Sequence, residues 1–210
     1  NVGWYLKLHW LHRVEAAKNA GIEVTVVSNF HDCSDVAREL QNLGIKVEHI
    51  PISRKSGNIW DELKNFLLLL SLLRRERPNI IHNITLKPVL LGWTAVRFLP
   101  SIRCVNSLPG VGVIFSGRKN KGLRRLIWFW LSFLRLSGRC PSFIFENQSD
   151  ARLIGGGLGL KQGNRFVSKG AGIDLAMYRP NSEPSKAPFR VLFAGRLLRE
   201  KGVLDLVEAI

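Results

Sequence analysis

The alternation of short apolar runs with helix-like segments constrains the fold of this chain most strongly. Runs rich in strand-forming residues at 22–27, 45–50, 79–84 and 101–106 are separated by segments in which apolar residues recur every three to four positions. Strands that alternate with helices in this way pair in parallel, because a crossover helix returns the chain to the starting edge of the sheet. The pattern therefore predicts an α/β fold with a Rossmann-like N-terminal domain and a parallel sheet.

A strand, a basic turn and the start of a helix close the chain. The apolar run at 191–194 leads into Gly195 and Arg196, and Lys201 precedes a new helical period. A glycine lets the backbone approach a ligand, and two cations beside the unpaired amides of a helix start suit a diphosphate. An ordinary βα turn with solvated charges is the alternative. We predict a diphosphate site at Gly195, Arg196 and Lys201.

The composition near the C-terminus predicts a domain boundary. Residues 180–188 contain three prolines and few apolar side chains, which is typical of a linker. The expected domains are therefore 1–179 and the beginning of a second Rossmann-like domain at 189–210. The sequence starts in a helix with no strand before it, and the last helical period is still running where it stops. We expect a fragment of a longer protein, truncated at both ends.

The charge balance predicts an anionic partner. The net charge is +15, and the interval between Glu76 and Glu146 contains 11 Lys and Arg but no acidic residue. Nucleic acid is not the expected partner, because no nucleic-acid-binding motif is recognised and the aromatic residues stand among aliphatic ones. An acidic lipid surface or a phosphorylated substrate remains.

One predicted helix combines basic and aromatic residues. On a helical projection of residues 121–139, one polar stripe has Trp128 in its middle, and apolar side chains cover the rest. The stripe consists of Lys121, Arg124, Arg125, Ser132, Arg135 and Arg139. This composition is typical of helices that lie on an anionic membrane surface. The alternative is a helix packed on the sheet with solvated arginines. We predict membrane docking through Arg124, Arg125, Trp128 and Arg135.

Other site classes are disfavoured by the sequence. Cys33, Cys104 and Cys140 are odd in number and far apart, which favours a reducing compartment over a disulfide framework or a zinc site. No convincing carboxylate or His/Cys cluster suggests a metal. The longest apolar run, at 126–134, is too short to span a bilayer.

Polar residues follow two neighbouring predicted strands. His82, Asn83, Thr85 and Lys87 stand at or just after the end of the run at 79–84, and Gly110 and Gly112 follow the next strand. In open parallel sheets, ligands bind beyond the carboxyl ends of the strands. The two glycines could bring backbone amides against a phosphate, although a plain turn explains them equally well.

Taken together, five motifs resemble a known family. They are HisAsnIleThrLeuLysPro at 82–88, AsnSerLeuProGlyValGlyValIlePhe at 106–115, PheIlePheGluAsnGlnSerAsp at 143–150, GlyAlaGlyIleAsp at 170–174 and GlyArgLeuLeuArgGluLysGly at 195–202. In order and spacing they are similar to retaining, GT-B-fold glycosyltransferases of the family 4-like group. The closest branch acts on undecaprenyl-diphosphate-linked sugars in bacterial O-antigen, capsule or N-glycan assembly.

The resemblance implies a function and roles for the predicted residues. A hexose or N-acetylhexosamine would pass from a UDP-sugar to a lipid-diphosphate-linked acceptor with retention, on the inner face of the cytoplasmic membrane. Arg196 and Lys201 would hold the donor diphosphate, so that no metal or other cofactor is expected. Thr85, Lys87 and the Gly110–Gly112 loop are the expected acceptor contacts.

The catalytic residues are less well defined by the resemblance. Many family members carry a histidine just after the strand that here reads ArgCysValAsnSerLeu, and this chain has none there. His82 and His12 are the remaining candidates. A nucleotide-sugar epimerase of the same architecture and a non-catalytic, membrane-associated scaffold are the alternative functions. Because the rest of the donor site would lie beyond Ile210, we expect the 210 residues alone to be inactive.

Overall fold

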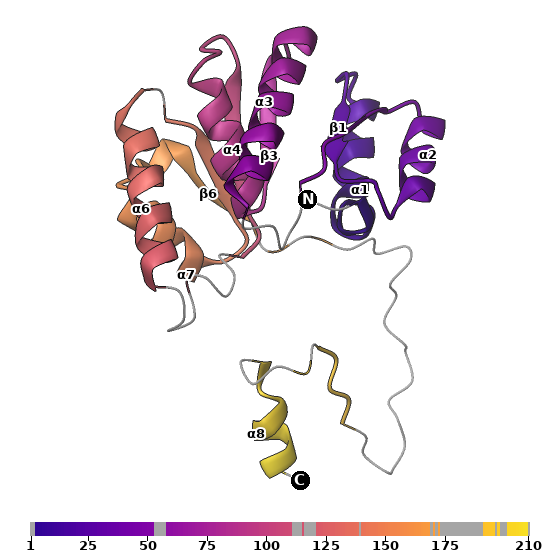
Figure 1. Cartoon of the computed structure of the whole chain (residues 1–210). Coiled ribbons are helices and arrows are strands. Elements are labelled where there is room, and N and C mark those ends of the chain that lie inside the picture. Colours follow the sequence, from indigo (N-terminus) through magenta and orange to yellow (C-terminus); the bar gives the residue numbers. More distant parts are fainter. Residues whose placement is uncertain are drawn as a thin grey trace. The chain divides into compact units, whose positions relative to one another are not determined.

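The computed structural model describes residues 3–52, 58–110, 115, 121–138, 140–168, 170, 172, 191–195, 197 and 201–209. The chain divides into two compact units, Asn1–Gly172 and Ile173–Ile210, and each is described by itself (Figure 1). The predicted linker at 180–188 lies outside the described residues, so the domain boundary near residue 179 stays a prediction.

In the first unit, helices and strands alternate as the sequence predicts. The order is α1 (Gly3–Asn19), β1 (Thr25–Ser28), α2 (Ser34–Asn42), β2 (Lys46–His49), α3 (Ile59–Glu76), β3 (Ile80–Ile84), α4 (Leu86–Val96), β4 (Arg103–Leu108), α6 (Lys121–Leu136), β5 (Ser142–Phe145), α7 (Gln148–Asp150), the π-helical turn η1 (Ala151–Gly156), the 3₁₀ turn η2 (Gln162–Asn164) and β6 (Arg165–Val167). The predicted α/β class is confirmed.

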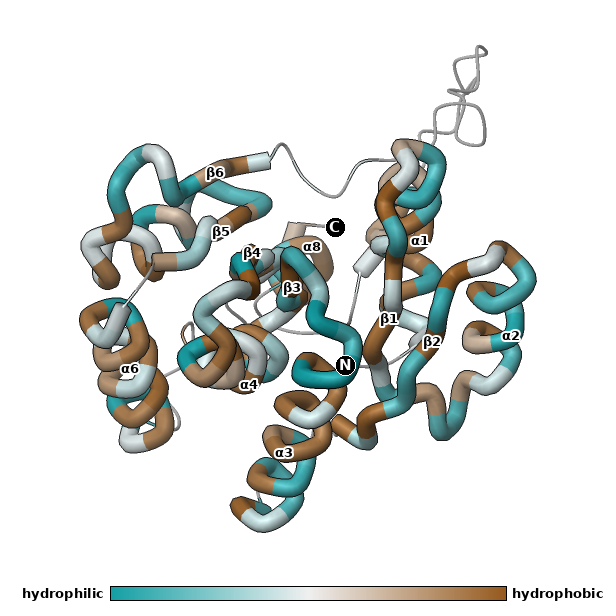
Figure 2. Tube along the Cα trace, turned by 90° about the horizontal axis from the view of Figure 1, so that it is seen from above, coloured by the Kyte–Doolittle hydropathy of each residue, from teal (hydrophilic) through white to brown (hydrophobic). Residues whose placement is uncertain are grey.

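The described strands form two parallel sheets. One contains β1 and β2, and the other has the order β3-β4-β5-β6. Figure 2 shows α3, α4 and α6 along one side of the four-stranded sheet. The main core lies between these helices and the strands, where the rings of Trp93 and Phe143 meet edge to face at 5.5 Å. A second core, around Phe30 and Leu40, joins the β1–β2 sheet to α1 and α2.

Trp128 takes a different position on α6 from the one expected for a docking residue. Its side chain is half-buried, and its ring meets that of Phe115 at 5.8 Å. Its indole also lies so close to Gly157 that a Cβ there would overlap it. The glycine therefore provides the space into which Trp128 packs, and the predicted basic stripe faces the protein at this point.

Two further findings concern membrane-spanning helices and metal sites. Within the described residues, none of the helices is long and apolar enough to cross a membrane. The same residues contain no group of three or more His, Cys, Asp or Glu side chains placed to hold a metal ion.

The described part of the second unit consists of one short helix and its approach. The helix α8 (Val203–Glu208) begins after Gly202, whose φ of 74° lies in the left-handed region that favours glycine. Residues 191–194 were expected to be a strand but form no β-ladder. Val191 and Leu192 are 64% and 88% exposed, and no strand among the described residues pairs with this segment.

Candidate functional site

The carboxyl ends of β3 and β4 bring a histidine and a serine into contact. In the parallel register Ile84 lies opposite Ser107, and His82 comes two residues before Ile84 on β3. Side chains two residues apart on a strand point to the same face, so His82 and Ser107 are diagonal neighbours on one face of the sheet. The distance between His82 Nε2 and Ser107 Oγ is 2.7 Å, within hydrogen-bonding range. This pair is the chemical centre of the candidate site.

Helix α1 supplies the other side of this centre. The ring of Trp10, which is 4% exposed, meets the His82 ring edge to face at 5.6 Å. The Arg13 guanidinium, one turn further along α1, lies 4.3 Å from the centre of the Trp10 ring. Desolvation by the surrounding protein, and secondly the charge of Arg13, lower the pKa of His82 below its ordinary value of 6.5. His82 is itself solvent-exposed at the edge of the sheet, so water limits this shift, and the imidazole is mainly neutral at pH 7.

A neutral His82 predicts a pH-dependent stability. Because its pKa is lower in the folded than in the unfolded state, the unfolded state binds more protons as the pH falls below about 6.5. This contribution is fully present above that pH and is lost below it. We expect the melting temperature of the native chain to fall between about pH 7.5 and 5, and His82→Gln to make this fall smaller. His12→Gln, at an exposed α1 position, should keep the native slope, and an unchanged slope in His82→Gln would contradict the assignment.

The opposite face of the same two strands carries a buried amide pair. Asn83 Nδ2 donates to Asn106 Oδ1 at 2.9 Å and lies 3.3 Å from Cys104 Sγ. Asn83 is 4% exposed and Asn106 is fully buried. Burial raises the pKa of the Cys104 thiol to about 12, so it stays protonated at neutral pH. The expectation that Asn83 faces a ligand at the sheet edge is therefore wrong, because its amide is buried against Asn106 and helps fix the relative position of β3 and β4.

Helix α4 packs directly on this amide pair. A Cβ at Gly92 would overlap the Asn83 side-chain amide, so the helix approaches the sheet this closely only because the residue is glycine. The close approach sets the distance between α4 and the sheet. It thereby also positions the start of the helix, where Thr85 and Lys87 lie.

Thr85 marks the turn between β3 and α4. It has φ 73° and ψ 162°, a conformation that costs about 1–3 kcal/mol for a residue with a side chain. Its backbone N–H donates to the Ser107 carbonyl oxygen at 3.0 Å, which ties the turn to the end of β4. The predicted acceptor residue Thr85 is thus in a strained, fixed turn next to the His82–Ser107 pair.

Lys87 has a partner that the sequence did not indicate. Its Nζ lies 2.6 Å from Glu62 Oε1 on α3, and the two side chains are 24% and 27% exposed. The ion pair holds the ammonium group at the beginning of α4. A phosphate that binds Lys87 would therefore approach a cation whose charge Glu62 partly neutralises.

The other residues predicted for the donor, the acceptor or catalysis fall into four groups. Gly110 is described, and a Cβ there would meet nothing within 4 Å, so neither packing nor backbone strain requires a glycine at this position. Gly112 and Arg196 lie outside the described residues. His12 is exposed on α1, where Trp10 rather than His12 contacts His82, and Gly195 and Lys201 belong to the second unit.

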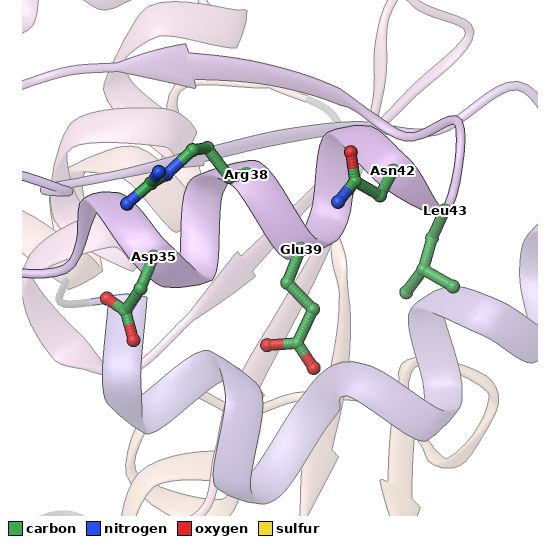
Figure 3. Close-up of a pocket in the computed structure, with 5 residues that line it drawn as sticks. All are labelled: Asp35, Arg38, Glu39, Asn42 and Leu43. Carbon is green, nitrogen blue, oxygen red and sulfur yellow. The ribbon is translucent and has the colours of Figure 1, made fainter.

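A surface pocket elsewhere on the first unit is not part of this site. It is lined by Asp35, Arg38, Glu39, Asn42 and Leu43 along α2. Figure 3 shows Asp35 and Glu39 pointing to one side of the helix and Arg38 to another. Glu39 already pairs with Lys7 of α1 at 2.6 Å. No convergent set of polar groups marks the pocket as a ligand site.

Comparison with known proteins identifies the family. A family model described as "Glycosyl transferase 4-like" matches residues 1–136, which include α1, β3, α4 and β4. The chain belongs to this family. The matched residues contain the His82–Ser107 pair together with Thr85, Lys87 and Gly110.

One curated relative of this glycosyl transferase 4-like chain comes from Campylobacter jejuni subsp. jejuni serotype O:2. It is 28% identical over 211 aligned positions, which cover 93% of this chain and 54% of the relative. Its name is N,N'-diacetylbacillosaminyl-diphospho-undecaprenol alpha-1,3-N-acetylgalactosaminyltransferase. The chain thus spans about half the length of the curated relative it matches.

Proposed function

We propose that the full-length protein transfers a hexose or N-acetylhexosamine from a UDP-sugar to a lipid-diphosphate-linked acceptor. Transfer occurs with retention, at the inner face of the cytoplasmic membrane, during assembly of a bacterial surface polysaccharide such as O-antigen, or of another glycan. The observation that carries this proposal is the similarity, over 93% of the chain, to a relative whose name states transfer to a diphospho-undecaprenol-linked sugar.

The first unit is proposed to form the acceptor side. The strained Thr85 turn is tied to Ser107 by a backbone hydrogen bond and leads into the start of α4, where Lys87 lies. Because the pKa of His82 is lowered, its neutral ring can accept a hydrogen bond from an acceptor hydroxyl, while Lys87 attracts the acceptor diphosphate. We propose the Gly110–Gly112 loop as a further acceptor contact through its backbone amides.

The second unit is proposed to hold the donor. Arg196 and Lys201 would make charge-assisted hydrogen bonds to the diphosphate, whose negative charge grows as the bond to the sugar breaks. Since two cations supply this stabilisation, we propose that neither a metal ion nor another cofactor is required. Gly195 would let the backbone approach the same phosphates.

The proposal is tested by measuring UDP release from a panel of UDP-sugars by the full-length protein. We expect release to depend on an undecaprenyl-diphosphate-linked sugar and to persist in EDTA. Acceptor-independent formation of an epimer would contradict the proposal in favour of an epimerase. Failure to bind any UDP-sugar would contradict it in favour of a non-catalytic scaffold, and loss of release in EDTA would refute the metal-free donor site.

A further inference from the structure

Helix α6 turns a broad apolar side outward, next to its exposed cations Lys121 and Arg125. The exposed residues follow one arc of the helix, which we name the apolar arc: Leu123, Leu126, Phe129, Trp130, Phe133 and Leu136. Phe129 and Phe133 are 67% and 51% exposed, and Leu136 is 84% exposed. A surface helix of a soluble domain normally turns charged and polar residues outward, so this arrangement is unusual.

Apart from Trp130, whose indole N–H donates to Thr94 Oγ1 of α4 at 3.0 Å, the side chains of the apolar arc are exposed rather than packed on the protein. Ile127, Leu131 and Leu134 attach the helix to the core and are 6%, 1% and 1% exposed. Trp128 also packs inward, against Phe115 and Gly157. The helix is therefore apolar on two sides, and only one of them is covered within the described residues. Contiguous apolar surface of this kind marks an interaction site.

The charges beside the apolar arc indicate what covers it. Lys121 and Arg125 are exposed along one flank of the arc. They lie in the interval from 77 to 145, which contains no Asp or Glu, in a chain of net charge +15. A second copy of the same chain would bring like charges together at this flank, whereas an anionic lipid leaflet complements them.

A second exposed apolar strip lies in the same layer of helices. Ile59 and Trp60, in the first turn of α3, are 75% and 73% exposed, and Leu63 and Leu67 continue the strip. Helix α4 lies between α3 and α6 on one side of the sheet (Figure 2). Tryptophan and other large apolar side chains, with cations near them, are the composition of a surface that rests in the headgroup region of a bilayer.

We propose that the apolar arc of α6 inserts into the boundary between headgroups and acyl chains of an anionic leaflet, with Lys121 and Arg125 on the lipid phosphates. In this proposal docking depends mainly on the insertion of apolar side chains. It does not depend on the whole of the basic stripe around Trp128 that the sequence predicted. Arg124 and Arg135 are half-buried and contribute less to it. The inference rests on the membrane location proposed above but requires neither sugar donor nor acceptor.

The test is sedimentation of the protein with vesicles of phosphatidylcholine and phosphatidylglycerol. We expect the double variant Phe129→Ser with Phe133→Ser to lower the partition coefficient at least tenfold. The matched control replaces Leu8 and Ile22, which are 68% and 58% exposed on and after α1, by serine and should stay within twofold of the native value. Lys121→Ser with Arg125→Ser should remove most of the salt dependence, while Arg124→Ser with Arg135→Ser should leave it largely intact.

A second measurement does not depend on the stability of a variant. The chain already contains six tryptophans, with Trp130 on the apolar arc, so each variant is compared with the native protein. Leu126→Trp adds an indole to the apolar arc, and the blue shift on vesicles and the quenching by brominated lipid should both exceed those of the native protein. Ile22→Trp should increase neither effect. Native partitioning by the double phenylalanine variant, or no increase in blue shift and quenching in Leu126→Trp, would overturn the proposal. So would a native dimer that this double variant turns into a monomer, because a second copy would then be the occupant.

The outcome separates this inference from the transfer reaction. UDP release can be measured with a detergent-solubilised acceptor and no vesicle. Retained transfer together with unchanged vesicle binding in the phenylalanine variant refutes the docking surface alone. Vesicle binding that depends on Phe129 and Phe133, in a protein without transfer, refutes the enzyme proposal alone.

Discussion

Arg196→Ala should lower the turnover of the full-length protein by about 10²–10³-fold, the loss typical when one donor of a site that stabilises developing negative charge is removed. Arg196 stands directly after Gly195, five residues before Lys201. If the guanidinium binds the leaving diphosphate, its removal leaves growing charge without its strongest hydrogen-bond donor. The effect should appear in kcat as well as in kcat/KM, because the charge develops in the transition state.

The measurement is acceptor-dependent UDP release by the native protein and its variants. Arg199→Ala, in the same basic turn and without an assigned role, is the matched control and should lose less than about threefold. Binding of the protein to anionic vesicles should be the same in both variants. Turnover of Arg196→Ala within threefold of the native value would show that this turn is an ordinary βα connection.

Gly92→Ala should lower the free energy of unfolding by about 3 kcal/mol. A Cβ at this position would overlap Asn83 Oδ1, and Asn83 cannot withdraw, because it is 4% exposed and hydrogen-bonded to Asn106. The variant must either move α4 away from the sheet or break the amide pair. Overpacking costs about 1–3 kcal/mol and an unpaired buried amide a similar amount, against a gain of about 1 kcal/mol in helix propensity.

Denaturant unfolding monitored by circular dichroism checks this prediction. Gly122→Ala is the matched control, since it places the same methyl group in helix α6, where a Cβ would meet nothing within 4 Å. It should raise the stability by up to about 1 kcal/mol. Equal effects at the two glycines would show that α4 does not depend on its close approach to Asn83.

The arrangement of the first unit could be predicted from the sequence because local patterns determine it. Apolar runs of about five residues between helical periods predicted a strand near each of β1, β2, β3 and β4, and the parallel pairing followed from the helices between them. The position of His82 and Thr85 at the carboxyl edge followed from the same reasoning.

Contacts between distant residues were beyond the reach of these patterns. The ion pair of Lys87 with Glu62 and the hydrogen bond of His82 with Ser107 each join residues 25 positions apart. Which side of α6 would face the sheet also depends on a distant residue, since Gly157 makes the room that Trp128 fills. A helical projection shows which residues share a face but not which face the fold covers.

The expected strand at 191–194 illustrates a further limit. Its apolar composition favours a strand, but a strand exists only when a neighbour pairs with its backbone. The described residues of the second unit supply no such neighbour. Because so little of the second unit is described, the donor side of the site stays a prediction from Gly195, Arg196 and Lys201. The proposed acceptor side, in contrast, can be discussed from distances between described residues.

The most direct test of the central proposal is the mass of the lipid-linked product. The full-length protein is incubated with UDP-sugars and an undecaprenyl-diphosphate-linked sugar, and the lipid fraction is analysed by mass spectrometry. We predict that the acceptor gains the mass of one hexose or one N-acetylhexosamine, and that the new linkage keeps the anomeric configuration of the donor. An acceptor of unchanged mass, with all of the UDP-sugar recovered intact or as its epimer, would contradict the proposal.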